Sequence, residues 1–178
     1  MHLPKLSVQD KRKKEKIQVQ TLWIFATKMI HIKAKTDGKS LGNPGKAYWI
    51  ALFDRKIDGS NRYYGEHNFG TNNEAEYNGV ILALEKVPCN SKLTIETDSQ
   101  LVWGQLTQDW KINQQTLFEK TQEIERLVDK KNIDLEVKWI PREKNTADFV
   151  LDKHLKKIGK LPNICPYCKR PLIEEKSN

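Results

Sequence analysis

The order of strand-like and helix-like segments constrains the fold of this chain more than any other feature. Residues 30–35 alternate apolar and polar side chains, which is typical of a half-buried strand. Similar stretches at 47–56 and 62–69 are joined through Asp58-Gly59, a dipeptide that favours hairpin turns. Helical and strand-like segments then alternate: a helix at 71–87, a strand at 92–97, helices at 99–106 and 116–130, a strand at 133–140 and a helix at 146–158. This order predicts an α/β fold that begins with an antiparallel meander and continues through crossover helices.

The two ends of the chain carry much of its positive charge. The net charge is +8, and residues 1–28, with seven basic and two acidic side chains, contribute +5 of it. The segment 153–170 contains no acidic residue. Such an excess favours a polyanionic partner, most simply nucleic acid. Residues 1–28 have two open interpretations: a flexible basic arm that adds affinity for nucleic acid, or a start-site artefact, with translation beginning at Met29. We therefore divide the chain into a basic extension (1–28), a main domain (29–158) and a C-terminal tail (159–178).

The compartment follows from what the sequence lacks. No apolar run approaches the length needed to span a bilayer, and the N-terminus has no signal-peptide pattern. Three cysteines make a poor disulfide framework, so a reducing compartment is the simpler interpretation. We expect a cytoplasmic protein that does not enter a membrane and acts as a monomer.

Four acidic residues fall at the ends of the expected elements. Asp37 closes the first strand, Asp98 closes the fourth, Glu76 lies early in the first long helix, and Asp148 lies in the first turn of the last helix. If the first and fourth strands are neighbours, Asp37 and Asp98 project side by side, and such like charges are favourable only around a cation. Oxygen ligands of this kind select Mg²⁺ or Mn²⁺. Taken singly, each acid also fits ordinary turn, cap or helix-dipole chemistry.

The sequences around the four acids separate these interpretations. In chain order they are Thr36-Asp37-Gly38-Lys39-Ser40 followed by Gly42-Asn43-Pro44-Gly45, then Thr71-Asn72-Asn73-Glu74-Ala75-Glu76-Tyr77, Thr97-Asp98-Ser99-Gln100-Leu101-Val102, and Trp139-Ile140-Pro141-Arg142-Glu143-Lys144-Asn145-Thr146-Ala147-Asp148. Over residues 29–158 the chain resembles the ribonuclease H family, which includes bacterial and archaeal HI enzymes and retroviral reverse-transcriptase domains. Four blocks in the family's order make the resemblance specific.

The resemblance implies a fold and an activity. The implied fold is a ribonuclease H-like five-stranded mixed sheet, with three antiparallel strands followed by two parallel ones, flanked by helices. The four acids become the catalytic residues and metal ligands, with Mg²⁺ as cofactor and Mn²⁺ as a substitute. The implied reaction is endonucleolytic hydrolysis of the RNA strand of an RNA–DNA hybrid by in-line attack of a metal-activated water. Two alternatives stay open: the same fold also cuts double-stranded RNA, or the chain is a hybrid- or RNA-binding module that does not cut.

Candidates for substrate binding also follow from the resemblance. They are Gly38, Asn43, Thr71, Asn72, Asn73, Trp110 and Arg142. Short amide side chains can donate to and accept from 2′-hydroxyls in the wide minor groove of a hybrid. Thr71 also fits helix capping, because Glu74 follows at capping-box spacing. Asn43 equally fits a turn, and Trp103 is expected to pack in the fold.

The chain departs from many family members in three places. The segment from Leu106 to Thr116 is too short for the basic helix that grips the hybrid in many relatives. The histidine that many relatives carry after the fifth strand is replaced by Pro141-Arg142-Glu143-Lys144, as in the histidine-lacking branch, and either Arg142 substitutes in part or turnover rests on the metals. Bulky Phe149 and Val150 stand where small residues are usual, which predicts altered packing of the last helix.

The tail contains Cys165-Pro166-Tyr167-Cys168, which looks like one half of a zinc ribbon. A structural zinc site needs four ligands, and a second Cys-x-x-Cys is absent. His154 or Cys89 could complete the site if the tail folds back, or two chains could share one ion. The alternative is a disordered tail with two free thiols.

Overall fold

The computed structural model describes residues 29–162. The basic extension 1–28 and the candidate zinc ligands Cys165 and Cys168 lie outside the described residues. Within the described part of the chain, none of the helices is long and apolar enough to cross a membrane.

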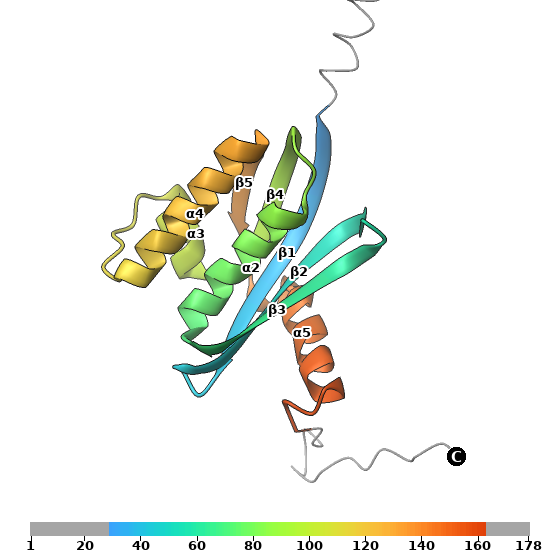
Figure 1. The fold of residues 1–178 in the computed structure, drawn as a ribbon, viewed down its shortest axis with the longest axis vertical. Coiled ribbons are helices and arrows are strands. Elements are labelled where there is room, and N and C mark those ends of the chain that lie inside the picture. Colours follow the sequence, from blue (N-terminus) through green and yellow to red (C-terminus); the bar gives the residue numbers. More distant parts are fainter. Residues whose placement is uncertain (1–28, 163–178) are drawn as a thin grey trace, which may run out of the picture. The chain divides into compact units, whose positions relative to one another are not determined.

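Five strands form a single mixed sheet in the described part of the chain. They are β1 (Ile30–Leu41), β2 (Gly45–Ile57), β3 (Ser60–Gly70), β4 (Ser91–Thr97) and β5 (Asp134–Trp139), arranged in the order β3-β2-β1-β4-β5 (Figure 1). The β1–β2 and β2–β3 pairs are antiparallel and the β4–β5 pair is parallel. The predicted meander and the mixed five-stranded sheet are therefore confirmed.

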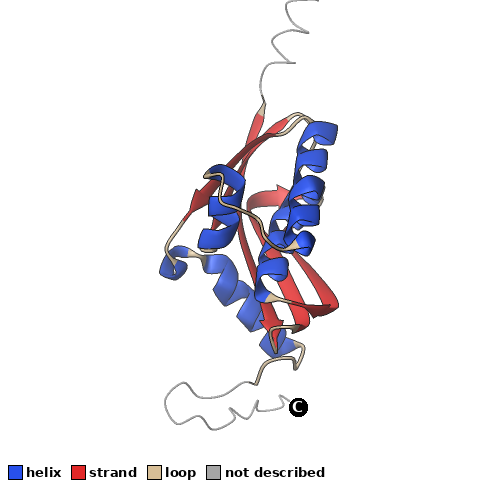
Figure 2. Ribbon diagram, turned by 90° about the vertical axis from the view of Figure 1, so that its left-hand side faces the viewer, coloured by secondary structure: helices blue, strands red, loops and turns tan. Residues whose placement is uncertain are grey.

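The helices divide between the two faces of the sheet (Figure 2). They are α2 (Asn72–Lys86), α3 (Gln100–Thr107), α4 (Gln115–Lys131) and α5 (Thr146–Lys157), with a short 3₁₀ turn, η1 (Arg142–Lys144), before α5. Ala51 of β2 belongs to the core under α2, α3 and α4, whereas its neighbour Ile50 packs with Leu151 and Leu155 of α5. Because successive strand side chains point to opposite faces, α5 covers the face that the other three helices leave free.

Strand β1 is longer than the sequence predicts, and this moves Asp37. The prediction that Asp37 closes the first strand is wrong, because β1 stays paired with β2 from Asp37 opposite Ile50 to Leu41 opposite Lys46. The turn-forming Gly42-Asn43-Pro44-Gly45 segment, not Asp37-Gly38, ends the strand. Asp37 therefore projects from the interior of the sheet, where it is only 5% exposed.

Candidate active site

Three carboxylates from separate elements meet beside the neighbouring strands β1 and β4. Asp37 comes from β1, Glu76 from the first turns of α2, and Asp98 directly follows β4. One carboxylate oxygen from each lies within 4.8 Å of the others. The structure thus brings together three of the four acids that the sequence singles out.

Gly38 allows α2 to approach β1 closely enough to bring Glu76 to Asp37. A Cβ atom at Gly38 would run into the backbone of Ala75 and Glu76 in the first turns of α2. Any other residue at this position would therefore push the helix off the strand. This packing requirement explains the glycine by itself, and its predicted contact with substrate stays a prediction.

The start of α2 is fixed by the capping box expected from the sequence. The Thr71 hydroxyl accepts from the backbone N–H of Glu74 at 3.2 Å, and the Glu74 carboxylate accepts from the backbone N–H of Thr71 at 2.7 Å. Because both bonds lie within five residues of Glu76, they fix the direction in which the part of the helix that carries Glu76 begins.

The cluster of carboxylates is electrostatically unfavourable without a cation. Burial raises the pKa of the Asp37 carboxyl to about 7, and the negative charges of Asp148 and Asp98 act in the same direction. Burial, followed by the charges of Asp37 and Asp98, raises the pKa of Glu76 well above its ordinary value. Asp37 Oδ2 and Glu76 Oε2 are also enclosed without a hydrogen-bond partner among the described residues. Two unpartnered buried oxygens, in a group of three carboxylates whose oxygens lie within 4.8 Å of one another, fit a divalent cation.

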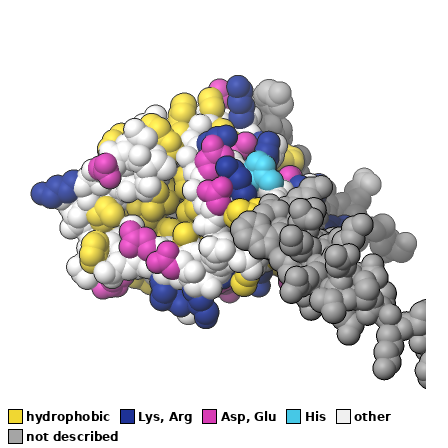
Figure 3. Space-filling model, turned by 90° about the horizontal axis from the view of Figure 1, so that it is seen from above, with side chains coloured by type: hydrophobic (Ala, Val, Ile, Leu, Met, Phe, Trp, Pro, Cys, Tyr) yellow, Lys and Arg dark blue, Asp and Glu magenta, His cyan; other side chains and the backbone are white. Residues whose placement is uncertain are grey.

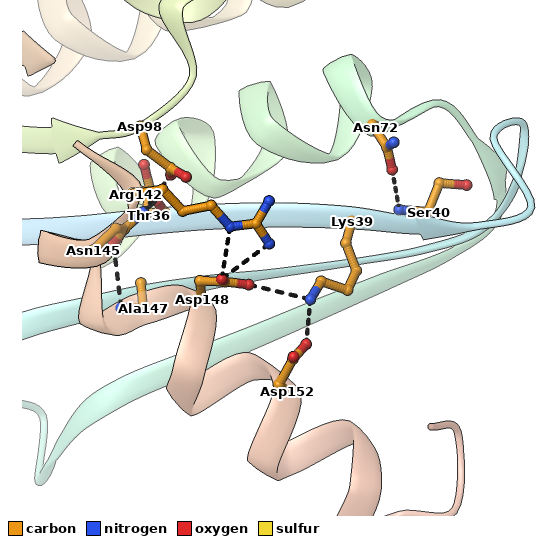
Figure 4. A network of polar contacts seen from close by, with 10 residues as sticks. All are labelled: Thr36, Lys39, Ser40, Asn72, Asp98, Arg142, Asn145, Ala147, Asp148 and Asp152. Carbon is orange, nitrogen blue, oxygen red and sulfur yellow. Dashed lines mark hydrogen bonds and ion pairs between the residues drawn. The ribbon is translucent and has the colours of Figure 1, made fainter. Parts of the chain in front are cut away.

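Asn145 orients Asp98 through a side-chain hydrogen bond (Figure 4). Its side-chain amide donates to Asp98 Oδ1 at 2.6 Å and to the backbone carbonyl of Thr36 at 2.9 Å. Its side-chain oxygen accepts from the backbone N–H of Ala147, which caps α5. Asn145 is buried and thus ties β1, Asp98 and the start of α5 to one another.

The fourth acid, Asp148, faces two cations instead of the other carboxylates (Figure 4). Its Oδ2 accepts from Arg142 Nε at 3.1 Å and from Nη2 at 3.0 Å, while its Oδ1 accepts from Lys39 Nζ at 3.2 Å. Lys39 also bonds to Asp152 one turn along α5. Burial alone would lower the pKa of Lys39, but the bonds and charges of Asp152 and Asp148 raise it. Asp148 lies close enough to influence Asp37 but is not part of the three-carboxylate cluster.

Asn43 and Asn72, like Thr71 and Arg142 among the candidate substrate contacts, take part in internal hydrogen bonds. The side-chain oxygen of Asn43 accepts from the backbone N–H of Asn72 at 2.9 Å, and that of Asn72 accepts from the backbone N–H of Ser40 at 2.6 Å. These bonds tie the β1–β2 turn to the start of α2, so the turn interpretation of Asn43 has structural support. Asn43 and Asn72 both occupy exposed positions.

Trp103 packs in the fold as the sequence predicts, whereas the contact of Trp110 with substrate stays a prediction. Trp110, in the α3–α4 connection, is 49% exposed, and its indole packs over Gly104. Trp103 is half-buried and meets Trp110 edge to face, with ring centroids 6.4 Å apart. Trp103 therefore packs against the exposed indole of Trp110.

The expectation about packing is wrong for Phe149, whereas Val150, named with it, is partly buried and packs against the core on the face of the sheet that α5 covers. Phe149, expected to alter the packing of the last helix, is 70% exposed because it sits on the side of α5 that points away from the sheet. Ala147 and Leu151 supply the buried face of that helix instead.

Sequence reasoning missed the contacts made by Lys39, Asn145 and Asp152. A signal exists for Asn145, because an asparagine just before a helix is a preferred cap. The sequence carries no comparable signal for Lys39 and Asp152, whose side chains meet across 113 residues of chain.

Comparisons with known proteins agree with this geometry. The sequence model of the family described as RNase H matches residues 30–149. The ribonuclease HI of Vibrio parahaemolyticus serotype O3:K6 is 35% identical over 127 residues, covering 70% of this chain and 75% of that protein. The ribonuclease H of Pseudomonas savastanoi pv. phaseolicola is 40% identical over 78 residues, 44% of this chain and 51% of that protein. The chain thus spans about half the length of several curated relatives that it matches.

A solved structure has a similar fold. LC11-RNase H1, isolated from compost and crystallised in complex with an RNA/DNA hybrid, is 30% identical, with a TM-score of 0.60 over 70% of this chain and 99% of that one. Because the family model covers well over half of the sequence and its matched region contains the three-carboxylate cluster, the chain belongs to the RNase H family.

Proposed function

We propose that this chain is a metal-dependent endoribonuclease that hydrolyses the RNA strand of RNA–DNA hybrids. The observation that carries the proposal is the cluster of Asp37, Glu76 and Asp98, with buried oxygens that lack partners, in a chain of the RNase H family. The hybrid bound to LC11-RNase H1 supports the choice of substrate.

Asp37, Glu76 and Asp98 would hold the cation, and oxygen ligands favour Mg²⁺, with Mn²⁺ as a substitute. When bound, such an ion supplies an activated water and neutralises charge on the phosphate. The protein contributes the geometry. Asn145 fixes the carboxylate of Asp98, and Gly38 permits the helix to carry Glu76 to the strand, so the three oxygens are positioned before an ion arrives.

Arg142 and Asp148 would lie at the edge of the site that receives the substrate. Arg142 is bound to Asp148, yet most of its side chain, 72%, is exposed. We propose that the guanidinium reaches a phosphate of the hybrid and partly replaces the histidine that many relatives carry there. A planar guanidinium can bind a phosphate through two parallel hydrogen bonds.

The grip on the hybrid would come from elements other than a basic helix. Only residues 108–114 separate α3 from α4, so the α3–α4 connection is too short for an inserted helix. On the face shown in Figure 3, acidic and basic side chains are interspersed. Among the described residues, basic side chains are paired with acids, as in Lys92–Asp134 and Lys138–Glu136. We therefore propose that exposed Trp110, the α2 start at Thr71 to Asn73, and the basic ends of the chain hold the hybrid.

The test offers the full chain labelled RNA–DNA hybrid, double-stranded RNA and double-stranded DNA, each with Mg²⁺, with Mn²⁺ and with neither. Asp98→Asn is compared with Asp134→Asn, which removes the same charge from an exposed position paired with Lys92. We expect metal-dependent cleavage of the RNA strand of the hybrid, lost in Asp98→Asn and kept in Asp134→Asn.

Each other outcome has a defined meaning. Cleavage of double-stranded RNA beside the hybrid would widen the substrate class. Binding of the hybrid without cleavage in either metal, or cleavage that survives Asp98→Asn, would contradict the proposed mechanism.

A further inference from the structure

Lys39 occupies a position in the site that the proposed function does not use. It projects from β1 two residues beyond Asp37, on the same side of the strand. Its Nζ lies 3.2 Å from Asp148 Oδ1 and also bonds to Asp152. Only 21% of the Lys39 side chain is exposed, so the ammonium is held inside the site between two residues of α5 (Figure 4).

The partners of the four acids divide them into the three-carboxylate cluster and Asp148. Asp37 and Glu76 each have a buried oxygen with no partner among the described residues. Asp148, by contrast, has Lys39 on one oxygen and Arg142 on the other. A cation that binds the first group satisfies unused oxygens, whereas a cation that uses Asp148 must replace an existing ionic contact.

The two cations on Asp148 differ in how firmly they are held. Arg142 is mostly exposed and has room to leave, since 72% of its side chain faces solvent. Lys39 is mostly enclosed and is anchored by Asp152 on the far side of its Nζ. Of the two, Lys39 is therefore the stronger competitor for Asp148.

We propose that Lys39, anchored by Asp152, is a resident cation that competes with divalent metal for Asp148. This inference rests on the proposed metal-dependent function. The three-carboxylate cluster binds an ion first, and an ion that recruits Asp148 binds more weakly because it displaces the ammonium. Lys39 is a positioning residue, since it acts through Asp148 and not on the substrate.

The test is a titration of the full chain with Mn²⁺, followed by calorimetry and by electron paramagnetic resonance of the bound ion. We expect a tighter and a weaker binding event in the unaltered protein. Lys39→Met should tighten the weaker event about tenfold, because a partly buried ionic contact no longer has to be broken. Lys39→Arg, which keeps the charge, should leave the weaker event close to its original affinity.

Lys33→Met is the matched control, because it removes the same charge from an exposed position on the same strand. Lys39→Gln provides a second variant, and circular dichroism verifies that each variant is folded. The inference is overturned if the weaker event is unchanged in Lys39→Met and Lys39→Gln, changes equally in Lys33→Met, or is absent from every protein. If the unaltered protein binds no Mn²⁺ at all, the proposed metal-dependent function itself fails, and this outcome is distinct from the others.

Discussion

The carboxylate cluster should make the metal-free protein less stable than a variant that cannot bind metal. Asp37→Asn replaces a buried carboxylate with a neutral amide of the same shape, and the new amide N–H groups can donate to Glu76 and Asp98. Because the charged form of Asp37 is disfavoured in the folded protein, replacing the carboxylate with a neutral amide should raise the free energy of unfolding. The same substitution should abolish Mg²⁺ binding.

The magnitude follows from the pKa of Asp37, which rises from 3.8 to about 7 on folding. A raised carboxyl pKa means that the folded state binds the proton more tightly than the unfolded chain does. Stability is therefore lost as the pH rises from about 4 through about 7. At about 1.4 kcal/mol for each pKa unit, the loss reaches at most roughly 4 kcal/mol at pH 8 and roughly 2 kcal/mol at pH 5. Asp37→Asn should recover much of each loss, and thus gain more at pH 8.

The assay is urea unfolding in EDTA at pH 5 and pH 8, with Asp134→Asn as the control. This control removes an exposed carboxylate and should change the free energy of unfolding by less than about 0.5 kcal/mol. Added Mg²⁺ should stabilise the unaltered protein more at pH 8 than at pH 5, because protons compete with the ion for Asp37. A gain for Asp37→Asn that is equal at both pH values, or a loss at pH 8, would refute the electrostatic reasoning.

Three further predictions concern the support of the site. Asn145→Ala should lower the free energy of unfolding by about 2–3 kcal/mol, because it removes the α5 cap and the bond to Asp98. Urea unfolding measures this change, and a loss below about 0.5 kcal/mol would contradict the proposed role of Asn145 in holding Asp98 and α5. Gly38→Ala should lower the melting temperature and weaken Mn²⁺ binding together, since its Cβ would displace the backbone at Ala75; a variant with both properties unchanged would show that the close approach is not required. Phe149→Ser should leave the free energy of unfolding within about 0.5 kcal/mol of its original value, because the ring is exposed, and a larger loss by urea unfolding would show that the ring packs.

The elements of the fold could be predicted from the sequence because their signals are local. Apolar periodicity, the capping box at Thr71 and Glu74, and Pro88 after α2 each involve residues close along the chain. The sequence does not determine that β1 lies beside β4, and the meeting of Asp37 with Asp98 depends on it. Once the structure shows these strands as neighbours, the meeting of Asp37 with Asp98 follows directly.

The end of β1 illustrates where local signals fail. Asp37-Gly38 has the composition of a turn, yet the strand continues to Leu41 because β2 offers hydrogen-bond partners along its whole length. The glycine serves the approach of α2 to the strand and not a turn. Pairing with a distant segment thus overrides a local preference.

The four acids and their surrounding motifs were determined by the sequence alone, while their division into three and one was decided by the tertiary structure. The contact between Lys39 and Asp148 joins residues 109 positions apart, and only the packing of α5 against the sheet brings them together. Burial likewise depends on the whole fold, and it raises the pKa of Asp37 and Glu76 in a way that a carboxylate in the sequence does not reveal. The sequence therefore supplies the ligands, and the packed structure decides which of them are free to receive a metal ion.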